Sequence, residues 1–260
     1  MSGPPAPVRR AVFTQGWTRL SYLHWPVEPA ALQSLLPPGL TPDLWEGQAW
    51  VGLIPFAMRR AGILGMPPLP YLSDFLETNV RSYTVAADGS RAVFFHTLEA
   101  DRLLPVLAAR ASYRLPYAWS RMRLVQQGDV VTYASERRWP APRGASSRIV
   151  VRVGDPVEAT PLDDWLTARW GLHSRWWGGS LVHAPVSHEP WPLRAAELLD
   201  LDEDLIATVG LPPPVGAPRV LHSDGVHVRL GRPDRVRAGD RSAQPAAGSP
   251  RSRSARWRAA

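Results

Sequence analysis

Hydrophobic residues along this chain alternate with polar ones more often than they follow a helical period. Residues 78–85 (TNVRSYTV) alternate as a strand does, and residues 49–56 (AWVGLIPF) have the continuous apolar run of a buried strand. Asp88-Gly89 is a hairpin signal, and it predicts that residues 91–98 return beside 78–85. Further strands are predicted at residues 122–125, 129–137, 148–153, 180–187 and 225–230.

Helical spacing is confined to short stretches. Pro29 suits the first position of a helix that stops at Pro37-Pro38-Gly39. Residues 101–113 have an apolar side, with Pro105 delaying the start, and Thr160 is a good N-cap. Strands outnumber helices, and hairpins outnumber βαβ units. We therefore predict one β-rich α+β domain in which a mainly antiparallel sheet closes into a barrel.

Composition narrows the classes of protein. The 260 residues are 45% hydrophobic, and no run of 18 apolar residues predicts a membrane span. There is no cysteine and no apolar leader, so we expect a cytoplasmic protein without thiolate chemistry. Every basic residue is arginine, and the absence of lysine excludes a lysine Schiff base and a phosphate-binding P-loop.

The net charge of +7 comes from one end of the chain. Residues 1–228 carry equal numbers of arginines and acids, while residues 229–260 carry nine arginines against Asp234 and Asp240. Few large apolar side chains follow Leu230, so we predict a disordered tail over 231–260, a loose segment over 1–14 and a domain over 15–230. The tail could contact RNA, but a solvated tail is favoured, and nucleic acid is not the expected partner.

The strongest candidate site is one strand face. Glu77, Asn79, Arg81 and Tyr83 are spaced by two residues and fall on the same side of a strand. In a pocket wall, Glu77 would have a raised pKa and could act as a general acid or base. The alternative is a solvent-facing strand that carries a Glu–Arg pair.

Other candidates are dispersed. Arg110 and Arg114, with Tyr117, could clamp a carboxylate, or could make ordinary surface ion pairs. His24 and His96 could line a pocket, although an isolated histidine on an apolar strand is more often a core residue. The remaining histidine spacings lack a metal-binding context, so we expect no metal site and no cofactor.

Six motifs in order carry a resemblance. They are HWPVEPAALQSLLPPGL, WEGQAWVGLIPFAMR, ETNVRSY, FFHTLEAD, ARASYRLPYAWSRM and HEPWPLRAAE. Together they resemble the YqjF-like family of uncharacterised bacterial proteins, in the acetoacetate decarboxylase-like superfamily, over about residues 15–224. The resemblance implies a cone-shaped, β-rich barrel around a small-molecule cavity, and a bacterial, cytoplasmic protein.

One departure from the superfamily pattern concerns the nucleophile. In acetoacetate decarboxylases, a lysine in a Pro-Lys-Lys stretch forms the Schiff base, with support from glutamates and an arginine. The similar stretch here is Leu115-Pro116-Tyr117-Ala118, and Glu77 matches the pocket glutamate. The resemblance therefore implies a retained framework without imine chemistry.

Two functions of different class follow. In the first, Glu77 is the acid/base and Tyr117 or Arg114 polarises an oxygen in lyase, hydratase or isomerase-like chemistry. In the second, the cavity only binds its ligand, as in a carrier or sensor. In either case the expected partner is a small carboxylate or carbonyl compound. The chain could also form a homo-oligomer. Nucleic-acid contact through the tail is the weakest alternative.

Overall fold

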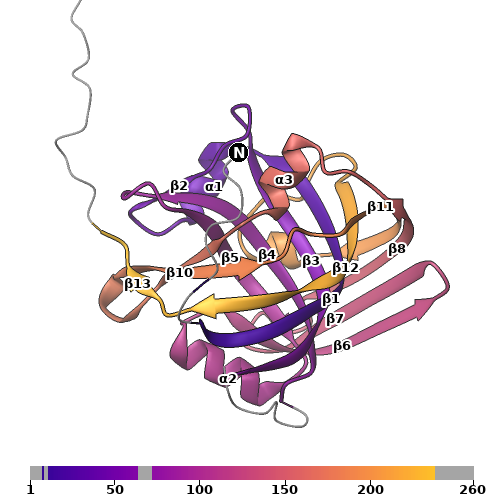
Figure 1. Ribbon diagram of the computed structural model, residues 1–260, viewed down its shortest axis with the longest axis horizontal. Coiled ribbons are helices and arrows are strands. Elements are labelled where there is room, and N and C mark those ends of the chain that lie inside the picture. Colours follow the sequence, from indigo (N-terminus) through magenta and orange to yellow (C-terminus); the bar gives the residue numbers. More distant parts are fainter. Residues whose placement is uncertain (1–7, 9–10, 64–71, 238–260) are drawn as a thin grey trace, which may run out of the picture.

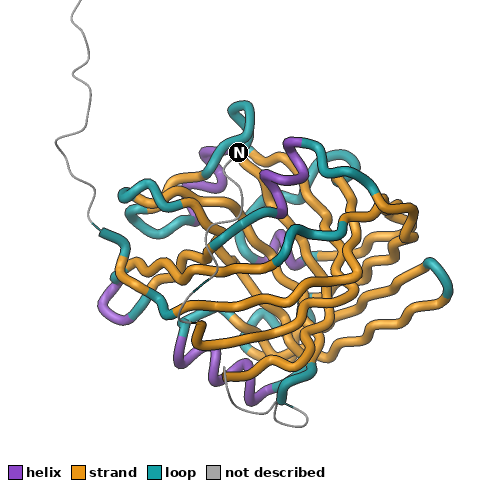
Figure 2. Tube along the Cα trace, in the orientation of Figure 1, coloured by secondary structure: helices purple, strands orange, loops and turns teal. Residues whose placement is uncertain are grey.

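All strands of the computed structural model, which describes residues 8, 11–63 and 72–237, belong to one 13-stranded sheet (Figure 2). In chain order they are β1 (Ala11–Val27), β2 (Leu40–Pro42), β3 (Ala49–Ile63), β4 (Phe75–Ala86), β5 (Arg91–Ala100), β6 (Tyr117–Gln127), β7 (Val130–Trp139), β8 (Ser146–Pro156), β9 (Gly171–Arg175), β10 (Leu181–His188), β11 (Leu193–Glu203), β12 (Arg219–Gly231) and β13 (Asp234–Arg235). The α-helices in this part of the chain are short: α1 (Pro29–Leu35), α2 (Leu103–Ser112), α3 (Pro161–Thr167) and α4 (Leu205–Thr208).

The sheet closes on itself. The order β5-β6-β7-β8-β11-β12-β1-β3-β4 returns to β5 through the β4–β5 hairpin, which gives the nine-stranded barrel of Figure 1. β9 and β10 bridge from β5 to β12, so β5, β9, β10, β12, β1, β3 and β4 enclose a smaller ring. Only β5–β6 and β5–β9 are parallel among the described strand pairs. The predicted β-rich α+β barrel is confirmed.

Strands β3 and β4 are buried on both faces. Ile54 and Phe56 belong to one hydrophobic cluster, whereas Val51 and Leu53, whose side chains point the other way, belong to another. Because successive side chains of a strand point to opposite faces, a strand covered on both sides needs a continuous apolar run. This explains the unbroken hydrophobicity of residues 49–56.

Within the described residues, no helix combines the length and apolar character needed to cross a bilayer.

Helix α3 begins at the predicted N-cap. The Thr160 hydroxyl accepts from the Asp163 N–H at 3.2 Å, and the Asp163 carboxylate accepts from the Thr160 N–H at 2.9 Å. Arg219 of β12 also pairs with Asp163. The cap therefore ties the helix to the barrel wall.

Removing this cap should measurably destabilise the protein. We expect Thr160→Ala to lower the free energy of unfolding by about 1 kcal/mol, because the Asp163 N–H loses its acceptor, the Thr160 hydroxyl. Urea denaturation measures the change. Ser34→Ala, an exposed hydroxyl on α1 that bonds only its own helix, is the control and should change stability by less than about 0.5 kcal/mol. Equal effects for the two variants would contradict the role of the cap.

Both predicted flexible ends are shorter than expected within the described residues. β1 begins at Ala11, inside the segment predicted to be loose, because it pairs with Gly231 of β12. β13 pairs with β10, and the Val236 N–H donates to the Leu181 carbonyl, so a tail beginning at residue 231 was placed too early. The rest of the two predicted segments, residues 1–7, 9–10 and 238–260, lies outside the described residues.

Candidate functional site

A small cavity lies within the ring that β9 and β10 complete. Its volume is about 60 Å³, and its polar lining consists mainly of Glu77 and Arg81 from β4, Tyr117 from β6, Arg169 and His188. Trp17, Phe95, Leu98, Leu172 and Trp191 supply much of its apolar wall. We call it the Glu77 cavity. Its mixture of an apolar wall and a few convergent polar groups is typical of small-molecule sites.

Glu77 is a buried carboxyl group at the centre of this arrangement. It is 3% exposed, so the solvent-facing alternative for this strand does not hold. The Tyr117 hydroxyl donates to Glu77 Oε2 at 2.7 Å, and Asn79 Nδ2 donates to Oε1 at 3.3 Å. Desolvation raises the pKa of Glu77 from its usual value near 4.5 to about 7, although both hydrogen bonds favour the anion. Glu77 can therefore hold or release a proton at neutral pH.

Arg81 is a buried guanidinium without a carboxylate. It is 6% exposed, and among the described residues no aspartate or glutamate forms an ion pair with it. Its Nη2 donates to the Leu166 carbonyl at 3.2 Å, its carbon Cζ lies 5.6 Å from the Tyr22 ring, and its Nε has no hydrogen-bond partner. A buried, unpaired charge is costly in free energy unless a ligand of opposite charge completes the site.

A second arginine reaches the cavity from beyond α3. The Nη1 atom of Arg169 donates to Asp43 Oδ2 at 2.6 Å, and its Nε donates to the Trp165 carbonyl at 2.7 Å. Asp43 also binds Arg91 at 2.7 Å and so serves both arginines. The Nη2 atom of Arg169 is buried without a partner. Asp43 thus fixes the guanidinium while one of its nitrogens stays available.

Unsatisfied polar atoms concentrate around this cavity. Most of the buried side-chain donors and acceptors without a partner, counted over the described residues, belong to Trp17, Tyr22, Asn79, Arg81 and Arg169. Buried polar groups are normally hydrogen-bonded, so such a concentration indicates that water or a ligand completes their bonding. Two of these atoms are guanidinium nitrogens, which favours an anion.

His24 supports the site from behind. Its Nε2 lies 2.6 Å from the Tyr83 hydroxyl, which itself donates to the Leu166 carbonyl at 2.8 Å. Because the single hydroxyl proton goes to Leu166, the Nε2 atom is the donor in the His24–Tyr83 bond. Burial, with nearby arginines, lowers the pKa of His24 well below its usual range, so the ring is neutral. His24 therefore does not line the Glu77 cavity, as predicted for a ligand contact, and acts on the site indirectly through Tyr83.

Three other predicted site residues lie elsewhere. His96, Arg110 and Arg114 line a second, larger cavity instead of the Glu77 cavity. A register shift in β5 between the partners of Val80 and Arg81 places His96 beside Ser82, at 2.9 Å, on the face opposite Glu77. The sequence spacing could not show this bulge, so it could not separate the two groups.

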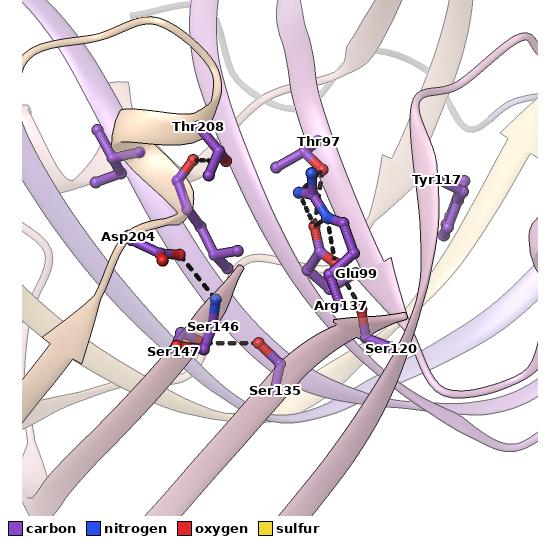
Figure 3. A network of polar contacts seen from close by, with 12 residues as sticks. Thr97, Glu99, Tyr117, Ser120, Ser135, Arg137, Ser146, Ser147, Asp204 and Thr208 are labelled. Atoms are coloured by element: carbon purple, nitrogen blue, oxygen red, sulfur yellow. Dashed lines mark hydrogen bonds and ion pairs between the residues drawn. The ribbon is translucent and has the colours of Figure 1, made fainter. Parts of the chain in front are cut away.

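That opposite face carries a buried ion pair. Arg137 of β7 pairs with Glu99 of β5, and Ser120 and Thr97 also donate to the Glu99 carboxylate, at 2.6 and 2.8 Å (Figure 3). Tyr117 stands apart from this network, with no bond to it in Figure 3. The Nε atom of Arg137 lies 3.1 Å from both carboxylate oxygens of Glu99.

Sequence reasoning missed Arg169, Asp43 and Trp17. Arg169 follows a short helix and Asp43 follows β2, and neither belongs to a motif that predicts a site. Their only sequence signal is an arginine and an aspartate in otherwise apolar surroundings. In the described residues, no group of three or more histidine, aspartate or glutamate side chains is arranged to hold a metal ion.

Comparison with known proteins places this geometry in context. The family model DUF2071, described as an uncharacterized conserved protein, matches residues 14–227. The uncharacterized protein YqjF of Bacillus subtilis (strain 168) is 33% identical over 189 residues, which are 72% of this chain and 76% of that protein.

Solved structures with the same fold are more distant in sequence. The enduracididine biosynthesis enzyme MppR complexed with pyruvate is 15% identical with a TM-score of 0.61, over 90% of this chain and 98% of that one. Acetoacetate decarboxylase from Legionella pneumophila is 14% identical with a TM-score of 0.60, over 91% and 92%. The barrel therefore has the acetoacetate decarboxylase-like fold.

Proposed function

This chain belongs to the DUF2071 family, and on that premise we propose that it binds a small keto or carboxylic acid in the Glu77 cavity and performs acid/base chemistry on it. The observation that carries the proposal is that one cavity holds both a proton-exchanging carboxyl group and an unpaired positive charge. A carboxyl group that titrates near pH 7 shares the space with a buried guanidinium that has no carboxylate partner. A ligand carboxylate would satisfy Arg81 and Arg169 and leave Glu77 to exchange protons.

The size of the cavity limits the ligand. A volume of about 60 Å³ corresponds to room for roughly four or five water molecules. A keto acid with three or four carbons fits this limit, whereas an aromatic acid needs the walls to move. The similarly folded MppR binds pyruvate, which is a ligand of this class.

Proton abstraction beside a carbonyl is the reaction that suits these residues. Ionised Glu77 takes a proton from the carbon next to the keto group, and the electrons of that C–H bond form the enolate. The guanidinium groups of Arg81 and Arg169 stabilise the charge that develops on oxygen. Tyr117, which donates to Glu77, orients the carboxylate, and return of the proton to carbon or oxygen regenerates the enzyme.

Imine chemistry is not part of the proposal. The chain has no lysine, and Tyr117 stands in the stretch where the resemblance places the Schiff-base residue. Its phenol is no imine-forming amine, and burial and the nearby Glu77 raise its pKa well above 10, so it stays protonated. The retained carboxyl and the lost nucleophile together favour proton transfer over decarboxylation.

Ligand binding and turnover can be tested separately with pyruvate. At 100 times its dissociation constant, pyruvate should stabilise the fold by about 2.7 kcal/mol, or roughly 5–10 °C in melting temperature. In D₂O, the enzyme should also replace the methyl protons of pyruvate with deuterium, which proton NMR follows. Glu77→Gln should keep the thermal shift and lose the exchange.

Arg81→Met is the matched binding variant. We expect it to weaken pyruvate binding at least tenfold without destabilising the free protein, since it removes an unpaired buried charge. Arg59→Met, at a half-exposed arginine on β3, should bind as the wild type does. Binding without exchange in the wild type would identify a carrier or sensor instead. The absence of any thermal shift with pyruvate, 2-oxobutyrate and lactate would contradict the ligand class.

A further inference from the structure

A second cavity, of about 430 Å³, opens on the other face of β5. Its charged and polar wall includes Arg110 and Arg114, next to the end of α2, Arg137 from β7, Arg175 from β9, and His96 and His173. Phe95 and Leu115 line both cavities and separate them. We call it the arginine cavity. It is several times larger than the Glu77 cavity.

The arginine cavity is strongly positive. Over the described residues that line it there are four arginines and no aspartate or glutamate. Glu99 is outside the lining and pairs with Arg137. Burial lowers the pKa of both His96 and His173 to about 4, so neither ring adds charge at pH 7. The positive charge of the wall therefore comes from its arginines, among them Arg110 and Arg175.

The position of Arg110 suits ligand contact. Its guanidinium lies 5.0 Å from the Trp139 ring and donates through Nη1 to the Tyr117 carbonyl at 2.6 Å. The Trp139 ring and the Tyr117 carbonyl hold the planar group at the cavity wall. Arg175 is exposed at the end of β9, and Arg137 presents a guanidinium that Glu99 and Thr97 hold rigid. Planar guanidinium groups recognise phosphate and carboxylate oxygens in pairs.

We propose that the arginine cavity is a second binding site, for a multiply charged oxyanion such as a phosphorylated or polycarboxylic compound. The volume accommodates a ligand too large for the Glu77 cavity, and the described lining includes four arginines and no aspartate or glutamate. The arginines also belong to different elements, so a ligand with at least two separated anionic groups is needed to engage them together. This inference does not rest on the function proposed for Glu77, because no arginine lines both cavities.

Calorimetric titration of the full chain tests the site. Inorganic pyrophosphate and citrate are titrated separately, and the tighter of the two identifies phosphate or polycarboxylate chemistry. Arg175→Gln and Arg110→Gln should each weaken the tighter probe at least tenfold, which is the cost of losing a charge-assisted hydrogen bond. Arg175 is exposed, so this variant keeps the test valid even if Arg110→Gln fails to fold.

Two control variants exclude general attraction to positive charge. Arg121→Gln removes an exposed arginine of β6, and Arg251→Gln removes one from the basic C-terminal segment. Both should bind the probe as the wild type does. The proposal is overturned if neither probe binds at millimolar concentration, if Arg175→Gln binds as tightly as the wild type, or if the controls weaken binding equally. Loss of pyruvate binding would leave this result unaffected, so the two proposals can fail separately.

Discussion

Glu77→Gln should melt about 6–10 °C higher than the wild type at pH 8 and differ little from it at pH 5. Burial raises the pKa of Glu77 to about 7, so the folded protein favours the protonated form, whereas the unfolded chain ionises near pH 4.5. The stability of the wild type should therefore fall as the pH rises from about 4.5 to 7, and then stay level. The loss amounts to about 3 kcal/mol, since each pH unit of pKa difference is worth about 1.4 kcal/mol. Glutamine cannot ionise and avoids this loss.

The neighbours of Glu77 allow the substitution. The glutamine carbonyl can accept from the Tyr117 hydroxyl, and its amide can donate to Asn79 Oδ1, which is buried without a partner, once the Asn79 amide turns over. Glu136→Gln is the control, because this glutamate is exposed on β7. Scanning calorimetry at the two pH values measures the difference. An advantage of Glu77→Gln that is equal at pH 5 and pH 8 would show that Glu77 ionises normally.

Arg137→Met should destabilise the protein by about 3–5 kcal/mol. The substitution leaves the Glu99 carboxylate, which is fully buried, without its counter-charge in the barrel interior. The Ser120 and Thr97 hydroxyls would still donate to the anion (Figure 3), but two neutral donors do not replace a guanidinium. Guanidinium chloride denaturation measures the loss in free energy of unfolding.

A double variant separates the buried charge from packing. Arg137→Met combined with Glu99→Gln has no isolated charge and should recover at least half of the lost stability. Arg148→Met removes the arginine of an exposed pair with Asp200 and should cost less than about 1 kcal/mol. If the single Arg137 variant is as stable as the Arg148 variant, the Glu99–Arg137 pair does not contribute as its burial implies.

Local sequence was sufficient for the hairpins and caps. The Asp88-Gly89 turn joins β4 to β5, and Thr160 caps α3, because these features depend on residues only a few positions apart. Residues 193–203 (LRAAELLDLDE) show the limit. They are rich in helix-forming leucine, alanine and glutamate, and yet they form β11, because β8 and β12 offer hydrogen bonds on both sides.

The candidate site also depends partly on local sequence and partly on tertiary structure. Period-two spacing alone placed Glu77, Asn79 and Arg81 on one strand face, and the lysine-free composition excluded a lysine imine before any fold was known. Barrel closure decided the rest. It brought Tyr117 and Arg169 to that face from distant segments, and a bulge in β5 turned His96 away toward a different cavity. The available side-chain chemistry and the face of a strand on which a residue lies are set by local sequence. Which side chains meet across a closed barrel is set by the register between strands that are distant in the chain.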